Sequence, residues 1–191
     1  MRGELERWGN DWFAVQVWTS REHLSAKHLV ARRYEVFLPC YLAQRKWSDR
    51  IKNVERALFA GYIFCRLSAE TLANVVTAPG VVCIVGDGCR PLPVASEEIE
   101  RLKCVVSQGL RTEPWEYLRS GQTVRVRRGP LKDVEGIFVK TTNRHRLVIT
   151  VTLLQRAVAV EIDPAWVDIE SREASDPALG VNSSGGSPRL M

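Results

Sequence analysis

Few residues in this 191-residue chain have the types and spacing that catalysis or metal binding requires. His23 and His28 are five residues apart, so on a helix they would not share one face as two metal ligands do. The pair Glu97-Glu98 begins a predicted helix, where compensation of the helix dipole explains it better than acid–base chemistry. No nucleophile elbow, P-loop or dinucleotide-binding glycine pattern occurs. We therefore predict no catalytic site, no metal and no cofactor, and a protein that is not an enzyme.

The number of cysteines and the net charge further narrow the class of protein to which this chain can belong. The five cysteines are odd in number and include no CxxC pair, which argues against a zinc site or a disulfide framework. Lys and Arg total 27 against 22 Asp and Glu, a mild basic bias that is compatible with nucleic acid but not diagnostic. The amino-terminal segment has no apolar core of the signal-peptide kind. We expect a cytoplasmic globular protein.

A basic segment with an embedded tryptophan is the first binding candidate. Residues 43–55 read AQRKWSDRIKNVE, which predicts a loop or an irregular hairpin. Cations interleaved with an aromatic ring suit phosphate contact and base stacking. A solvated loop is the alternative. The candidate nucleic-acid-binding residues are Arg45, Lys46, Trp47, Arg50 and Lys52.

An aromatic strand face is the second candidate. The segment LFAGYIFCRL, residues 58–67, alternates Tyr62 and Phe64 on one side with core-type residues on the other. Phe59 and Trp12 are expected nearby. The face is either an exposed protein-binding patch or is covered by helices or by a second domain, and periodicity does not separate the two.

The elements that carry these candidates predict an α+β protein. Residues 12–108 read strand, helix, strand, strand, helix, strand, helix, which is a split βαβ (ferredoxin-like) arrangement. Serines 20, 68 and 96 are the expected helix caps. The predicted organisation is a disordered start at 1–10, a first domain at 11–108, a linker at 109–119, a second domain at 120–170 and a disordered tail at 171–191.

The second domain is predicted from the segment GQTVRVRRGPLKDVEGIFVK, residues 121–140. Valines alternate with arginines as in a half-buried strand, a Gly-Pro turn follows, and a later glycine marks a bulge or a close backbone approach. About five short strands at close spacing predict a small SH3-like all-β barrel. The residues expected to shape the turn are Gly129, Pro130, Leu131 and Gly136.

Four stretches together resemble the NusG family of transcription elongation factors over about residues 11–170. They are WFAVQVWTSRE, LFAGYIF, APGVVCIVG and VRVRRGPLKDVEGIFV, the last of which resembles the KOW motif. The stretch RKWSDRIKNVERALF resembles the specialised UpxY-like antiterminators of the family. The resemblance implies an NGN domain followed by a KOW domain, and a non-catalytic factor that suppresses pausing or termination. A KOW-containing ribosomal or general RNA-binding protein is the alternative.

The resemblance also assigns partners. It implies docking on the clamp of RNA polymerase through an aromatic patch, and contact of the basic segment with non-template DNA. It implies that the KOW domain recruits Rho or a small-subunit ribosomal protein, but Leu154, Gln155 and Arg156 stand where an aromatic is common, which argues against both. We expect a monomer with no membrane partner. The polymerase-binding residues that the resemblance implies are Trp12, Phe59, Tyr62 and Phe64.

Overall fold

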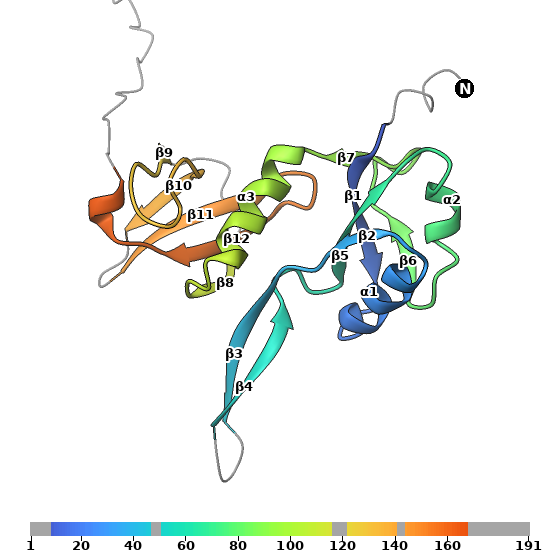
Figure 1. The fold of residues 1–191 in the computed structure, drawn as a ribbon, viewed down its shortest axis with the longest axis horizontal. Helices are drawn as coiled ribbons and strands as arrows, with labels where there is room; N and C mark the ends of the chain where they lie inside the picture. Colours follow the sequence, from blue (N-terminus) through green and yellow to red (C-terminus); the bar gives the residue numbers. More distant parts are fainter. Residues whose placement is uncertain (1–8, 47–50, 116–121, 141–143, 168–191) are drawn as a thin grey trace, which may run out of the picture.

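A computed structural model describes residues 9–46, 51–115, 122–140 and 144–167. The chain forms two units, each built on one sheet, with helix α3 (Ser96–Ser107) between them (Figure 1). The first unit runs from β1 through α3, and the second runs from β8 onward. The expected disordered segments fall almost wholly outside the described residues.

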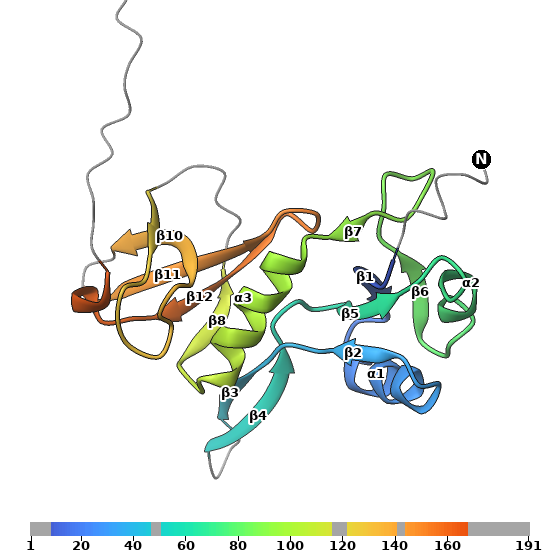
Figure 2. The ribbon, with the colours of Figure 1, turned by 45° about the horizontal axis from the view of Figure 1, so that its top comes forward.

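The first sheet has the predicted split βαβ topology. Its strands lie in the order β2-β5-β1-β6, every neighbouring pair is antiparallel, and β5 separates β1 from β2. Helices α1 and α2 lie beside this sheet (Figure 2). The elements are β1 (Asp11–Val17), α1 (Glu22–Ala31), β2 (Glu35–Phe37), β5 (Tyr62–Leu67), α2 (Leu72–Val75), β6 (Val81–Ile84) and β7 (Pro93–Val94), which pairs with β1.

The two faces of this sheet are both buried. Phe13, Val15 and Ile63 pack with Leu29 of α1 and Val75 of α2 in one core cluster. The opposite face carries Trp12, Ala14 and Phe64, which belong to a second cluster with α3 and with residues of the second unit. Alternation along β1 and β5 therefore has the predicted two-residue period.

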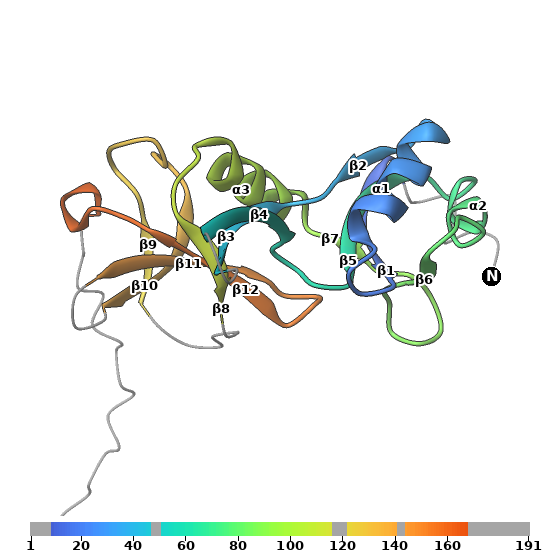
Figure 3. The same ribbon diagram turned by 90° about the horizontal axis from the view of Figure 1, so that it is seen from below.

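The basic segment forms a regular hairpin. Strands β3 (Cys40–Lys46) and β4 (Ile51–Ala57) pair without a register shift, from Cys40 opposite Ala57 to Lys46 opposite Ile51. The hairpin projects away from both sheets (Figure 1), and in the view from below it overlaps α3 (Figure 3). Its two strands pair with each other in a separate two-stranded sheet.

The second unit is a five-stranded antiparallel sheet in the order β8-β12-β11-β10-β9. One strand was not expected: β8 lies inside the segment predicted as a linker. Pro114 made that segment look like a connection, but an edge strand tolerates proline, and Thr112 is buried opposite Val160. The elements are β8 (Thr112–Trp115), β9 (Thr123–Arg125), β10 (Glu135–Lys140), β11 (His145–Val151), β12 (Arg156–Glu161) and the 3-10 helix η2 (Pro164–Trp166).

The glycines of the predicted turn have the expected steric roles. Gly129 has a φ of 79°, and a Cβ added there would lie 2.6 Å from Cδ2 of the Trp166 ring. At Gly136 a Cβ would lie 2.7 Å from the Val148 carbonyl oxygen, so this position requires glycine because another backbone segment approaches it closely. Leu131 is fully buried beneath the turn.

The predicted serine caps are wrong. The residues preceding the three α-helices are Arg21, Thr71 and Ala95, and none makes a side-chain capping hydrogen bond. Ser20 instead has a φ of 68°, and its N–H donates to the Glu22 carboxylate at 3.1 Å. The helix starts are thus shaped by the chain around them rather than by local serines.

Candidate docking site around Tyr62

The four aromatic residues assigned to docking do not share one exposed face. Trp12, Phe59 and Phe64 are each no more than 1% exposed, and Phe59 meets Phe64 edge to face at 5.6 Å. The covered-face alternative therefore holds for these three, because α3 and the second unit pack over them. Of the four, Tyr62 alone is partly exposed. The candidate site is centred on its ring.

A tight turn from Phe59 to Tyr62 positions that ring. The Tyr62 N–H donates to the Phe59 carbonyl at 3.0 Å, and Gly61 has a φ of 80° that favours glycine. The buried Glu22 carboxylate accepts the Gly61 N–H at 2.7 Å. Glu22, at the start of α1, therefore fixes the turn from another element. The sequence analysis missed this role of Glu22, because residues 22 and 61 lie far apart in the chain.

The second unit reaches this ring. The Arg156 guanidinium lies 4.9 Å from the centre of the Tyr62 ring, and its Nη1 donates to the Ala60 carbonyl at 3.3 Å. Arg156 follows the β11–β12 turn (residues 152–155), in which Gln155 has a φ of 48° and Leu154 is half-buried against the shared core cluster. Two regions that the sequence assigned to different partners thus contact each other.

A carboxylate of α3 makes another polar contact between the units. Thr152 donates its hydroxyl to Glu98 Oε1 at 2.7 Å, and its N–H lies 3.3 Å from both Glu98 oxygens. Glu98 is buried, and hydrogen bonds to an ionised acceptor are stronger than neutral ones. The helix-dipole explanation of Glu98 missed this contact, because residues 98 and 152 are brought together only by the fold.

Tyr62 borders a surface hollow of about 440 Å³, which we call the Tyr62 hollow. Ile84, Val85 and Pro91 supply apolar lining, while Gln16 accepts a hydrogen bond from the Cys83 thiol at 3.4 Å. Its outer loop is ordered by Asp87, whose Oδ1 accepts the N–H groups of Cys89 and Arg90. These hydrogen bonds lower the pKa of Asp87. The remaining lining residues are Gly86, Gly88, Cys89 and Arg90.

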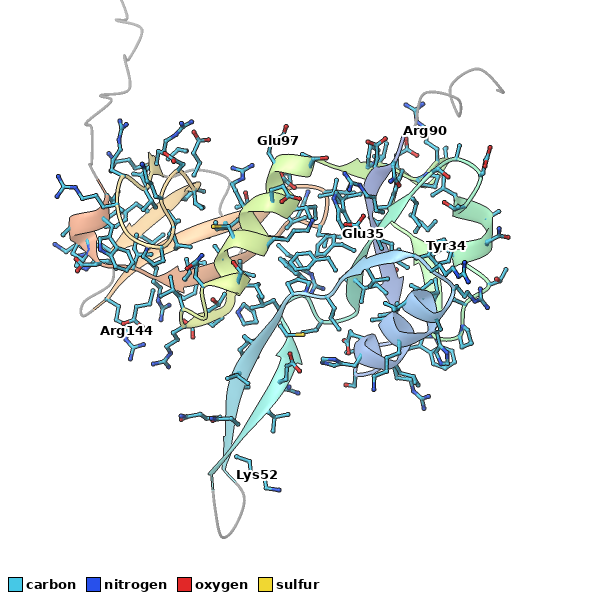
Figure 4. The ribbon with its side chains drawn as sticks, viewed as in Figure 1. Tyr34, Glu35, Lys52, Arg90, Glu97 and Arg144 are labelled. Atoms are coloured by element: carbon cyan, nitrogen blue, oxygen red, sulfur yellow. The ribbon has the colours of Figure 1, made fainter. Side chains whose placement is uncertain are left out.

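The structure describes the nucleic-acid candidates only in part. Arg45 and Lys46 occupy β3, but their side chains, and the whole of Trp47 and Arg50, lie outside the described residues. Lys52 is exposed on β4 near the tip of the hairpin (Figure 4). The register places Lys52 directly opposite Arg45.

The histidines and thiols do not form a reactive centre in the described part of the chain, where no three His, Cys, Asp or Glu residues are grouped to hold a metal. His23 Nε2 lies 3.9 Å from the Cys40 Sγ, and His145 stacks on Phe138 at 5.7 Å. Burial, with the neighbouring Glu55 and Glu22 charges, raises the pKa of Cys40 to about 11, so this thiol is not activated.

These features define a two-unit α+β protein with a surface hollow beside Tyr62. The family described as "Transcription termination factor nusG" matches residues 10–103. The chain belongs to the NusG family of transcription factors. No helix within the described residues is long and apolar enough to cross a membrane.

Similar proteins cover most of the chain. The "Transcription termination/antitermination protein NusG" of Escherichia coli K12 is 25% identical over 171 residues, spanning 82% of this chain and 94% of that protein. The Helicobacter pylori J99 protein of the same name is 23% identical over 165 residues, spanning 80% and 94%. The structure titled "Domain interaction in Thermotoga maritima NusG" matches with a TM-score of 0.53 and 19% identity, covering 85% of this chain and 98% of that chain. This structural likeness supports the two-unit fold.

Proposed function

We propose that this protein is a non-catalytic elongation factor that docks on RNA polymerase through the surface around Tyr62 and suppresses pausing and termination. The names of its relatives, which include termination and antitermination, support this class of activity. The observation that carries the proposal is the partly exposed Tyr62 ring beside a hollow of about 440 Å³ with a partly apolar lining. In this proposal the first unit is an NGN domain and the second a KOW domain, as in the specialised UpxY-like antiterminators.

Docking at Tyr62 has a clear physical basis. A partner that inserts an apolar side chain into the Tyr62 hollow gains contact with the ring and with Ile84, Val85 and Pro91. A few aromatic anchors usually supply most of the affinity of such an interface. Binding that bridges parts of the polymerase favours the elongating state, which is how a factor without catalytic groups reduces pausing.

The contact between the units gives this docking site a closed form. Arg156 and the β11–β12 turn lie over Tyr62 and Ala60, where they compete with any partner for the same ring. We infer that docking requires the second unit to move off this surface. The same movement frees Leu154, Gln155 and Arg156 to contact a partner of their own, and the missing aromatic argues that this partner is neither Rho nor a small-subunit ribosomal protein.

The projecting hairpin supports contact with non-template DNA. Arg45 and Lys52 occupy directly opposite positions near the end of the hairpin, so the register brings two basic residues to the same place. Basic residues gathered in this way suit contact with backbone phosphates. The hairpin projects away from both sheets, so it reaches nucleic acid without disturbing the docking surface (Figure 1).

The test is substitution of Tyr62 by alanine in the full chain. We expect Tyr62→Ala to abolish co-purification with RNA polymerase and to remove readthrough in an in vitro termination assay, with the circular dichroism spectrum unchanged. The matched control is Tyr34→Ala, because Tyr34 lies at the opposite end of the β1–β5 pair (Figure 4). Retained polymerase binding by Tyr62→Ala would refute the docking site. Sedimentation with ribosomes in the absence of polymerase would support the RNA-binding alternative instead.

A further inference from the structure

We propose that a second pocket, at the end of the first unit away from Tyr62, binds a phosphate group. The pocket has a volume of about 330 Å³ and is lined mainly by cationic and hydroxyl side chains. It lies where the end of α1, the start of β2 and the end of β5 meet, beside Tyr34 and Glu35 (Figure 4). We call it the arginine pocket. Its lining residues are Asn10, Arg32, Arg33, Tyr34, Glu35, Arg66, Ser68 and Thr71.

The charge of the arginine pocket suits a phosphate. Three arginines face one carboxylate, Glu35, so the formal charge of the lining is +2. A phosphate monoester carries about −1.5 to −2 near pH 7, which this lining neutralises. Guanidinium groups also match the planar, two-point geometry of phosphate oxygens.

Two of the arginines are held in place before any ligand arrives. Arg32 donates to the carbonyl oxygens of Asn74 and Thr77 at 3.1 and 3.2 Å, and to the Thr77 hydroxyl at 2.9 Å. Arg66 donates through Nε to the Asn10 carbonyl at 2.9 Å and pairs with Glu35 at 3.3 Å. Within the described part of the chain no carboxylate pairs with Arg32 or Arg33. The pocket therefore holds fixed positive charge that its own carboxylate only partly offsets.

Arg33 occupies a backbone position that favours glycine. Its φ is 68°, and the N–H of the next residue, Tyr34, reaches back to the Leu29 carbonyl at 3.1 Å, which is the usual glycine-ended helix stop. A long cation is a poor choice for this geometry on stability grounds alone. A ligand that needs the cation explains why a strained position carries arginine.

Neutral polar residues complete the pocket. The Ser68 and Thr71 hydroxyls lie 3.2 Å apart, and the Thr71 hydroxyl donates to the Ser68 carbonyl at 3.0 Å while accepting the Ser68 N–H at 2.9 Å. Ser68, Thr71 and Asn10 all line the pocket. The volume exceeds that of one phosphate, so a sugar or a neighbouring nucleotide also fits. The phosphate belongs either to a small phosphorylated molecule or to a nucleic-acid strand.

This site is separate from the docking site. The β1–β5 register places Trp12 opposite Arg66 at one end and Gln16 opposite Tyr62 at the other. The arginine pocket therefore lies at one end of this strand pair and the Tyr62 hollow at the other. The proposal stands or fails independently of polymerase docking.

The test uses inorganic phosphate, adenosine 5′-monophosphate, adenosine and a short single-stranded oligonucleotide, each titrated against the full chain at constant ionic strength set with chloride. We expect thermal stabilisation and shifts of the Arg33 and Ser68 amide resonances with at least one phosphate-bearing probe and none with adenosine. Dependence on the monophosphate or on inorganic phosphate identifies a small molecule, whereas dependence on the oligonucleotide alone identifies a strand.

Two substitutions at one position separate charge from strain. Arg33→Gln keeps the strained backbone and removes the charge, whereas Arg33→Gly removes both, so we expect each to weaken phosphate binding at least fivefold and only Arg33→Gly to raise the unliganded Tm. Arg128→Gln, in the second unit, is the control for net charge and should leave the affinity unchanged. Equal weakening by Arg128→Gln, or stabilisation by phosphate no greater than by chloride, would overturn the proposal.

Discussion

The contact between the two units predicts that weakening it increases polymerase affinity. Thr152→Val removes the hydrogen bond from the Thr152 hydroxyl to the Glu98 carboxylate. Hydrogen bonds to charged groups contribute about 1.5–3 kcal/mol, and we take the low end, about 1.5 kcal/mol, because Thr152 is exposed. Arg156→Ala removes the contact with the Tyr62 ring and the bond to the Ala60 carbonyl, together about 1.5 kcal/mol. The double variant therefore shifts the closed–open equilibrium by about 3 kcal/mol, which is about 100-fold.

Affinity measures this shift even when the open form is rare. When only a fraction of the protein is competent to bind, the apparent dissociation constant is the intrinsic constant divided by that fraction. A mostly closed protein thus gains the full 100-fold or so in affinity, although its scattering profile barely changes. The assay is titration of RNA polymerase with the wild-type and double-variant chains, read by fluorescence anisotropy.

Two controls make the result specific. Arg144→Ala is the same chemical change on an arginine that pairs with Glu161 in the second unit, and it should leave the affinity unchanged (Figure 4). Adding Tyr62→Ala to the double variant should remove the gained affinity, since the released surface is the proposed docking site. A folded double variant whose polymerase affinity equals that of the wild type would show that the contact does not restrain docking.

Two further predictions test the fold itself. Gly129→Ala should lower the free energy of unfolding in urea by about 2–3 kcal/mol, because the residue has a φ of 79° and its new Cβ meets the Trp166 ring. The control Gly88→Ala has a φ of 92° but open space around it, so it should lower the free energy of unfolding by only about 1 kcal/mol. Equal losses would contradict the steric argument. Iodoacetamide at pH 8 should modify the exposed Cys83 and Cys89 first and Cys65 only after unfolding, since burial raises the pKa of the Cys65 thiol to about 12. Peptide mass spectrometry measures the order of modification, and early labelling of Cys65 would contradict its burial.

The sequence predicts local periodicity well in this chain. The alternation in residues 62–67 placed Tyr62 and Phe64 on one face and core-type residues such as Ile63 on the other, as the core clusters confirm. The period is a property of the strand itself and needs no knowledge of neighbours. What covers each face is a tertiary property, and for that reason the sequence left the aromatic face either exposed or covered.

The missed residues share one physical cause. Glu22 and Glu98 each lie in the first turn of a helix, where a carboxylate is expected on local grounds. Their actual acceptor roles involve Gly61 and Thr152, which lie 39 and 54 positions away in the chain. Pairing of β8 with β12 is similarly distant, and Pro114 pointed locally to a connection. A local rule explained each residue adequately and so concealed the long-range contact.

The meeting of Arg156 with Tyr62 changes how the two binding predictions relate. Taken from the sequence, the aromatic strand and the β11–β12 turn are independent sites for different partners. In the folded chain they are each other's partner, joined by a ring contact at 4.9 Å and flanked by the Glu98–Thr152 bond. A ligand of either region must displace the other, so the two binding events favour the same open state. Binding at one site then increases affinity at the other by the same factor in both directions, which is a coupling that two unconnected sites would not have.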